Sequence, residues 1–306
     1  MARGRMSGWL LCAALAALAC MLPAQGAQNA PLQVEANMLV TGRITIERDG
    51  TASDWTLDQR EKLPREVVEL IDESLPSWRF EPVLIDGEPV RGSARMRLSL
   101  HAVPLPDGGH GARIADARFG IAAQPSKLID ADERAERIAN DTSSLVAIDM
   151  SPPHYPVEAV RRGFAGIVHL AVRVNRAGQV EDVVAEQVNL RQRARSREMD
   201  RMRSLFAQAA IGAARQWTFR VPTTGEQAAQ PFWTLRTWTS YSLGAAPHDP
   251  DKRGDYGKWD AYFAGPKIPI PWEIDAAEAG IPYALEPGAI HVAGTGLRLL
   301  TPLDGG

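Results

Sequence analysis

An ordered series of strand, turn, strand, helix and strand patterns occurs twice in this chain, and it constrains the fold more than any other feature. In the first copy, residues 40–48 (VTGRITIER) carry apolar side chains at alternate positions, which is typical of a half-buried strand. Asp49-Gly50 follows as a hairpin turn signal, and residues 51–57 supply a second strand. A helical pattern then runs from Pro64 to Trp78, and residues 93–102 form the last strand.

The second copy repeats this order farther along the chain. Residues 166–175 (GIVHLAVRVN) alternate in the same way, Ala177-Gly178 turns the chain, and residues 180–190 form the next strand. A helical pattern ends at Trp217, and residues 232–243 form the closing strand.

The two copies also agree in their spacing. The hairpin glycine lies 28 residues before Trp78 in one copy and 39 residues before Trp217 in the other, so the second copy is 11 residues longer. The extra length falls in residues 191–203, which we interpret as an inserted loop. We therefore expect an α+β fold with two ββαβ units, at 38–105 and 152–244, each a small antiparallel sheet packed on one helix.

The remaining segments show no sustained period. We interpret residues 106–151 as a linker, with a short strand around residues 113–121. Residues 245–306 are rich in proline, glycine and scattered aromatic residues, and we expect an irregular tail. Because large aromatic side chains are costly to leave in water, this tail is expected to wrap onto one of the units.

The amino-terminal residues 1–26 have the pattern of a secretory signal peptide. Arg3 and Arg5 precede an apolar run of 14 residues, whereas a membrane-spanning helix needs about 20. We expect cleavage after Gly26 and release into the periplasm. Two alternatives stay open: lipid attachment at Cys20, and retention of the segment as an inner-membrane anchor facing the periplasm.

Composition excludes several classes of protein. Cys12 and Cys20 are the only cysteines, and both lie in this leader, so cleavage would leave no disulfide, no cysteine nucleophile and no cysteine-ligated metal. The formal charge of −3 gives no support to nucleic-acid binding.

The second copy resembles the C-terminal domain of the TonB family, the periplasmic energy transducers of Gram-negative bacteria. The first copy resembles it with less fidelity, so the domain looks duplicated. The positions that carry the resemblance in the second copy are Tyr155, Pro156, Gly163, Gly166, Gly178, Val180, Trp217, Phe219 and Pro222.

The resemblance implies a protein-binding function. In the family, the domain captures an extended segment of an outer-membrane receptor, which adds as a strand to the edge of the sheet. The corresponding edge strand here consists of Thr234, Leu235, Arg236, Thr237, Trp238, Thr239, Ser240 and Tyr241. We expect Arg236 and Trp238 to face outward. Pairing of two copies through their sheet edges is a second arrangement, and energy transduction would require a retained anchor.

Catalysis is not expected from the motifs. None of the six histidines stands three or four residues from another, and no HExxH, phosphate-loop or nucleophile-elbow motif occurs. We therefore expect no enzyme, no metal and no cofactor, with a periplasmic enzyme or metal protein as the alternative.

An arginine-rich stretch follows the second strand of the second copy. We interpret it as a solvated basic loop, with contact to an anionic partner as the alternative. Its members are Arg191, Arg193, Arg195, Arg197, Arg201 and Arg203.

Overall fold

The computed structural model describes residues 34–85, 87–106, 108–121, 140–243, 256–272 and 290–303. The expected signal segment lies outside the described residues. Within these ranges, no helix has both the length and the apolar character needed to cross a bilayer. The strands are β1 (Val34–Ile46), β2 (Ala52–Leu57), β3 (Leu84–Ile85), β4 (Glu88–Pro89), β5 (Gly92–Pro104), β6 (His110–Ile121), β7 (Val146–Asp149), β8 (Gly166–Asn175), β9 (Val180–Leu190), β10 (Thr218–Arg220), β11 (Phe232–Tyr241), β12 (Asp260–Phe263) and β13 (His291–Val292). The helices are α1 (Arg65–Ser74), α3 (Val157–Arg162) and α4 (Ser196–Ala214), with short 3-10 turns at Arg60–Lys62, Leu75–Ser77 and Glu226–Ala229.

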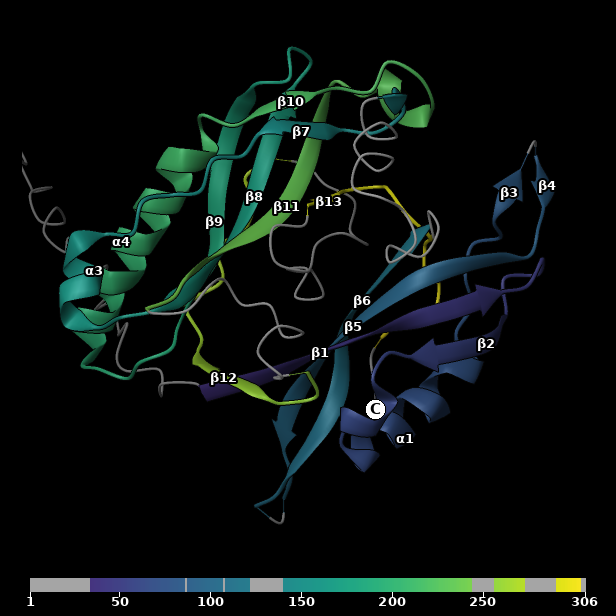
Figure 1. The fold of residues 1–306 in the computed structure, drawn as a ribbon, viewed down its shortest axis with the longest axis horizontal. Helices are drawn as coiled ribbons and strands as arrows, with labels where there is room; N and C mark the ends of the chain where they lie inside the picture. The colour runs from purple at the N-terminus through teal and green to yellow at the C-terminus, as the bar shows by residue number, and fades with distance from the viewer. Residues whose placement is uncertain are drawn as a thin grey trace, which may run out of the picture. The chain divides into compact units, whose positions relative to one another are not determined.

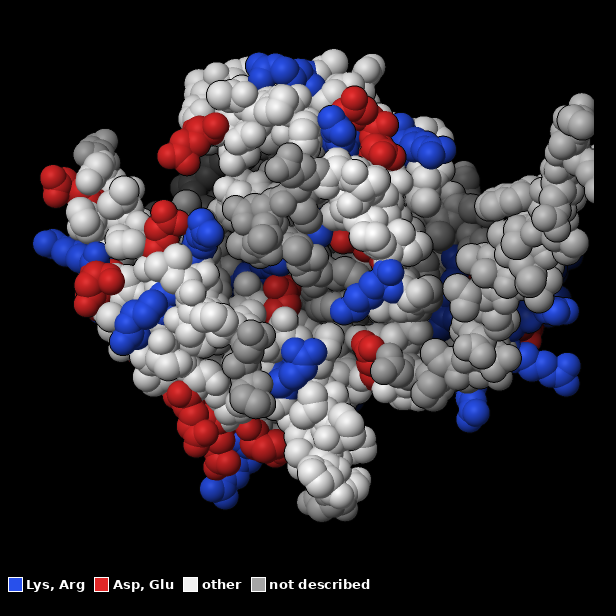
Figure 2. Space-filling model, turned by 180° about the vertical axis from the view of Figure 1, so that it is seen from behind, with Lys and Arg blue, Asp and Glu red and all other residues white. Residues whose placement is uncertain are grey.

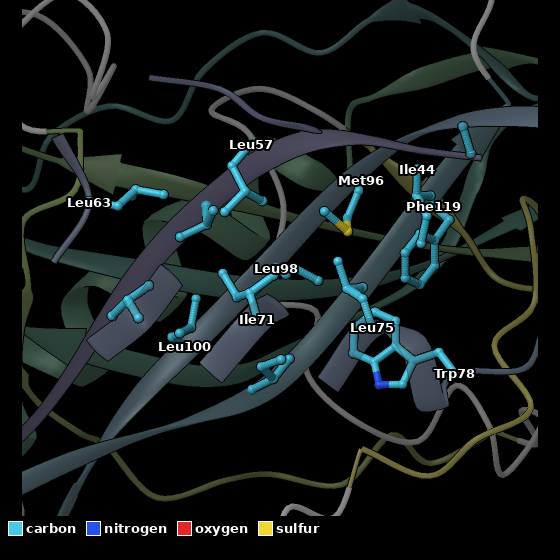
Figure 3. Packing of buried hydrophobic residues seen from close by; sticks show 14 of the residues in the cluster. Ile44, Leu57, Leu63, Ile71, Leu75, Trp78, Met96, Leu98, Leu100 and Phe119 are labelled. Atoms are coloured by element: carbon cyan, nitrogen blue, oxygen red, sulfur yellow. The ribbon is translucent and has the colours of Figure 1, made fainter. Parts of the chain in front are cut away.

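Strands β2, β1, β5 and β6 lie side by side in that order, and we call them the first half-sheet (Figure 1). Their alternating apolar side chains face α1, because a strand turns successive side chains to opposite faces. Figure 3 shows Leu98, Ile71, Leu75 and Trp78 meeting in this core, and each is nearly or fully buried. Phe119 of β6 completes it with an edge-to-face contact to Trp78, at 5.8 Å between ring centroids.

Strands β9, β8 and β11 form the second half-sheet, with α4 packed on β8 and β9. β8 and β9 have the same bounds as the strands expected from the sequence. Val172 and Leu235, on paired strands, are fully buried on the helix-facing side, and so is Phe206 of α4. The arginine-rich stretch differs from expectation, because α4 already begins at Ser196 and takes up much of the predicted loop.

The two half-sheets are joined into one nine-stranded antiparallel sheet, so the expectation of two separate small sheets is wrong. The connection is β12, which lies in the segment predicted to be an irregular tail. Residues Asp260–Phe263 pair with the start of β1, and Phe263 also pairs with Leu190 of β9. A strand that pairs on both sides removes two open edges at once, which explains why the halves merge.

Each half-sheet uses a hairpin glycine in the same way. Gly50 and Gly178 have φ values of 82° and 76°, and each accepts a backbone hydrogen bond of 2.8 Å, from the N–H of Phe80 and of Phe219 respectively. A Cβ at either glycine would collide with the carbonyl oxygen of that phenylalanine. The close approach therefore requires glycine in both halves.

The C-terminal residues follow the sheet more closely than an irregular tail would. Tyr256, Tyr262 and Trp272 are buried, at 4%, 4% and 9% exposure. Farther along, Leu299 forms a β-bridge with Phe80, a residue of the core under the first half-sheet. Part of the predicted linker is also ordered, since it contains β6 and β7, and β7 pairs with β10.

Candidate protein-binding edge of the sheet

The outer side of β11 is the edge at which the sequence predicts partner binding. On its inner side β11 pairs with β8 along all ten of its residues. On its outer side, the carbonyl oxygen of Thr234 accepts a hydrogen bond from the N–H of Ala293 at 2.8 Å. Since the backbone groups of alternate residues point to the same side of an antiparallel strand, those of Arg236, Trp238 and Ser240 also point outward.

This edge is not bare, which corrects the expectation of an open rim. β13 pairs antiparallel with it, placing Val292 opposite Leu235 and His291 opposite Arg236. Among the residues that the structure describes, strand pairing on this side covers only these two positions, whereas β11 continues to Tyr241. The sequence could not predict β13, because a two-residue strand has no periodicity.

Arg236 does not face solvent, which corrects a second expectation. Its side chain is 2% exposed and forms an ion pair of 3.0 Å with Glu186 of β9, itself 4% exposed. The physical reason is that the face of the second half-sheet opposite α4 is covered as well. Trp272 lies there, and its Nε1 donates to Oγ1 of Thr234 at 2.9 Å.

The buried pair of Glu186 and Arg236 is an electrostatic feature that the sequence analysis missed. Burial raises the pKa of the Glu186 carboxyl, and the Arg236 guanidinium acts in the opposite direction. Oε2 of Glu186 has no hydrogen-bond partner within the described ranges. Breaking such a pair leaves one buried charge uncompensated, so it disfavours any arrangement of β11 and β9 that separates the two groups.

Two histidines in the sheet have lowered pKa values, His169 on β8 and His101 on β5. Burial, together with the charge of His101, lowers the pKa of His169, on β8 opposite Trp238, to about 3. Burial, with the charges of Arg113 and Lys267, lowers the pKa of His101 to about 4. Both are therefore neutral at physiological pH, and His169 is buried, at 7% exposure.

The positions that carried the family resemblance support the fold of the second half-sheet. Tyr155 donates to the carbonyl of Phe164 at 2.6 Å, and its ring packs edge-on against Tyr241. Gly163 ends α3 with φ of 69°, and Nε1 of Trp217 donates to the carbonyl of Ser151 at 2.9 Å. Pro156 precedes the first residue of α3, and Gly166 and Val180 begin β8 and β9. Phe219 lies in β10 and Pro222 follows that strand, and both are buried.

The arginine-rich stretch divides into two groups. Arg203 donates to the carbonyl oxygens of Phe263 and Ala264, and Arg191 forms an ion pair with Asp260, so both hold the β12 segment against β9. Arg201 forms an ion pair with Glu158 of α3 at 2.7 Å. The other members, Arg193, Arg195 and Arg197, are exposed.

The surface charges and the possible metal ligands were compared over the described residues. On the face shown in Figure 2, basic and acidic residues are interspersed and do not gather into one patch of a single sign. Within the described ranges, no group of three or more His, Cys, Asp and Glu side chains is placed to hold a metal ion.

Comparison with known proteins supports the resemblance in part. No protein-family model matches the chain. A stretch of 81 residues, 26% of this chain, is 38% identical to "Protein TonB" of Xanthomonas campestris pv. campestris strain B100, and the values for strain ATCC 33913 are the same. In both cases the match covers 31% of the relative, so the chain spans about a third of the length of these proteins. The similarity to TonB is distant and partial, and it points to the cell envelope.

Proposed function

We propose that this chain is a TonB-like protein-binding module of the cell envelope, which captures an extended segment of a partner protein by strand addition at the outer edge of β11. The observation that carries the proposal is the geometry of that edge: within the described ranges, β13 pairs with β11 opposite Leu235 and Arg236, and β11 continues to Tyr241 with the backbone groups of Ser240 facing outward. An outer-membrane receptor or another envelope protein would supply the segment, with backbone hydrogen bonds providing most of the affinity.

Two further features agree with this function. The partial similarity to TonB proteins is one. The other is that β11 is held rigidly, by β8 along one side and by the buried pair of Arg236 and Glu186 beneath it. A rigid edge lowers the entropic cost of ordering a partner strand.

We include in the proposal that the two half-sheets are a duplication. The same strand order and the same contact between a hairpin glycine and a phenylalanine support it. Release into the periplasm also belongs to the proposal, with an anchored energy transducer as the alternative. The mass of the mature chain separates the two, because cleavage after Gly26 removes Arg3 and the apolar run.

A peptide titration tests binding at the edge. Isotope-labelled full chain would be titrated with synthetic peptides that have the amino-terminal sequences of outer-membrane receptors, and backbone NMR shifts would be recorded. We expect shifts concentrated in β11, between Trp238 and Tyr241. Shifts confined to other elements, or none at millimolar peptide, would contradict the proposal.

A proline variant sharpens this test. Ser240→Pro removes an outward-facing N–H from the edge and takes none from the ladder with β8, so the chain should fold and bind peptide at least about fivefold more weakly, the equivalent of about 1 kcal/mol. Ser240→Ala keeps the N–H and is the matched control, with the affinity of the parent. Equal affinity of the two variants would exclude pairing at this position.

A further inference from the structure

A basic surface lies where α3 meets the start of α4. The two helices lie side by side there (Figure 1), and two ion pairs join them: Arg162 with Glu198 at 2.8 Å, and Arg201 with Glu158 at 2.7 Å. The turn before α4 is fixed to the same place, because the side chain of Gln192 accepts a backbone hydrogen bond from the segment between α3 and β8. Helix α3 and this turn therefore belong to one surface, which we call the basic surface.

Four arginines of the basic surface keep their charge uncompensated. The carboxylates beside them are already used, since Glu158 and Glu198 pair with Arg162, and Asp200 pairs with Arg203. Among the residues that the structure describes, no ion pair is formed by four exposed arginines of α3, the turn and the first residues of α4. They are Arg161, Arg193, Arg195 and Arg197. The surface therefore has an excess of positive charge, although the formal charge of the whole chain is −3.

Apolar side chains lie beside these arginines. Val157 and Val160 of α3 are 65% and 46% exposed. Residues three and four apart lie on the same face of a helix, so both valines share a face with Arg161. Ala159, the buried residue of α3, lies on another face and packs toward the protein. Helix α3 therefore turns an outward face to solvent on which apolar and positively charged side chains are mixed.

We propose that the basic surface docks the chain on an anionic phospholipid bilayer. The guanidinium groups would bind the phosphate oxygens of the headgroups, to which arginine donates in a bidentate way, and the valines would enter the interfacial layer. The charges are spread over a helix face and a turn, and mobile headgroups adapt to such an arrangement. An acidic protein segment would need carboxylates at matching fixed positions. The proposal goes beyond strand addition at β11 and does not depend on it.

Vesicle sedimentation tests the proposal. The protein is the chain expected after cleavage, residues 27–306, because the apolar run of the leader would itself bind lipid. The probes are vesicles of phosphatidylcholine with about 30% phosphatidylglycerol, and vesicles of phosphatidylcholine alone. We expect binding to the anionic vesicles at low salt, at least tenfold weaker binding to the neutral ones, and release from the anionic vesicles at about 0.5 M salt, where charges are screened. Equal binding to both kinds of vesicle would overturn the proposal.

A charge variant locates the binding surface. Each arginine near an anionic bilayer is worth about fivefold in partitioning, so Arg193→Gln/Arg195→Gln/Arg197→Gln should weaken binding about 100-fold. The matched control, Arg48→Gln/Arg65→Gln/Arg215→Gln, removes the same charge at exposed positions in other parts of the chain and should bind within about twofold of the parent. A similar loss in both triple variants would mean that net charge, and not the basic surface, governs binding.

A second variant tests the valines and keeps every charge. Val157→Ser/Val160→Ser should weaken binding to anionic vesicles about fivefold, because it removes apolar surface that would leave water in the interfacial layer. Both side chains are exposed, so the melting temperature should stay that of the parent, and this variant still tests docking if the arginine variant does not fold. Unchanged binding to anionic vesicles would overturn the insertion of α3.

A soluble acidic probe distinguishes a bilayer from a protein partner. If a glutamate decapeptide binds the parent, loses affinity with the triple variant of Arg193, Arg195 and Arg197, and no vesicle binds, the surface recognises acidic protein and the lipid proposal is overturned. The peptide titration of β11 is a separate measurement. Its failure beside vesicle binding that depends on the arginines would refute strand addition and leave lipid docking supported, and the reverse pair of results would refute lipid docking alone.

Discussion

The first and second half-sheets have the same strand order but complete their outer edges differently. β5 is paired along its length with β6, which also buries Phe119 against Trp78 and Phe80. At the equivalent place on β11, the described part of the chain contributes the two residues of β13. The difference teaches that two halves with one strand order can bury different amounts of apolar surface at the same edge, because β6 brings Phe119 and Ile114 into the core of the first half.

The largest expected effect is a difference in stability between variants of β6 and of β13, the strands that pair with β5 and β11. Phe119→Ala in β6 should lower the free energy of unfolding by about 3–5 kcal/mol, because it opens a cavity beside two aromatic rings. Val292→Ala in β13 should cost about 1–2 kcal/mol, since it removes two methyl groups and not an aromatic ring. Urea denaturation measures both. Equal losses would show that β6 and β13 contribute equally to the stability of the fold.

The next effect tests whether the hairpin glycines have the same role in the two half-sheets. Gly50→Ala and Gly178→Ala should each cost about 3 kcal/mol, because both demand a positive φ and a close approach to a carbonyl oxygen. Gly212→Ala in α4 is the matched control: a Cβ there meets open space, and the helix should gain up to about 1 kcal/mol. A large loss at only one of the two hairpins would break the equivalence.

A smaller effect depends on pH and belongs to the second half-sheet. The folded-state pKa of His169 is about 3, below the unfolded value of 6.5, so the unfolded chain binds a proton first as pH falls. Stability contributed by the neutral ring is complete above pH 6.5 and is lost toward pH 3, by about 2 kcal/mol between pH 7 and pH 5.

Denaturation at pH 7, 6 and 5 checks this slope. His169→Gln should lack that part of the slope, and the exposed His154→Gln should keep it. If both variants follow the parent, His169 is not the group responsible.

The smallest effect concerns the connection between the halves. Arg203→Ala removes hydrogen bonds to Phe263 and Ala264 and should cost about 1 kcal/mol, with faster amide hydrogen exchange in β12. Arg197→Ala, in an exposed position on the same helix, should change neither. Faster exchange throughout the sheet, and not in β12 alone, would show that the two halves unfold together.

Much of each half-sheet was predictable from local patterns. β8 and β9 were expected at their observed bounds, because Val168, Leu170, Val172 and Val174 alternate with residues of the other face. The candidate edge itself was also located from the sequence. What was missed has no periodic signal: β12, β13, and the burial of Arg236, which depends on a glutamate 50 residues away.

The amino-acid sequence by itself determined the repeated strands, the two core helices and the glycine hairpins, because alternation, helical spacing and positive φ are local properties of the chain. Tertiary structure alone decided that the halves share one sheet, that Arg236 is buried, and that β13 lies on the edge of β11. These outcomes depend on which distant segment satisfies an open edge or a buried charge, and that choice depends on contacts between residues far apart in the chain.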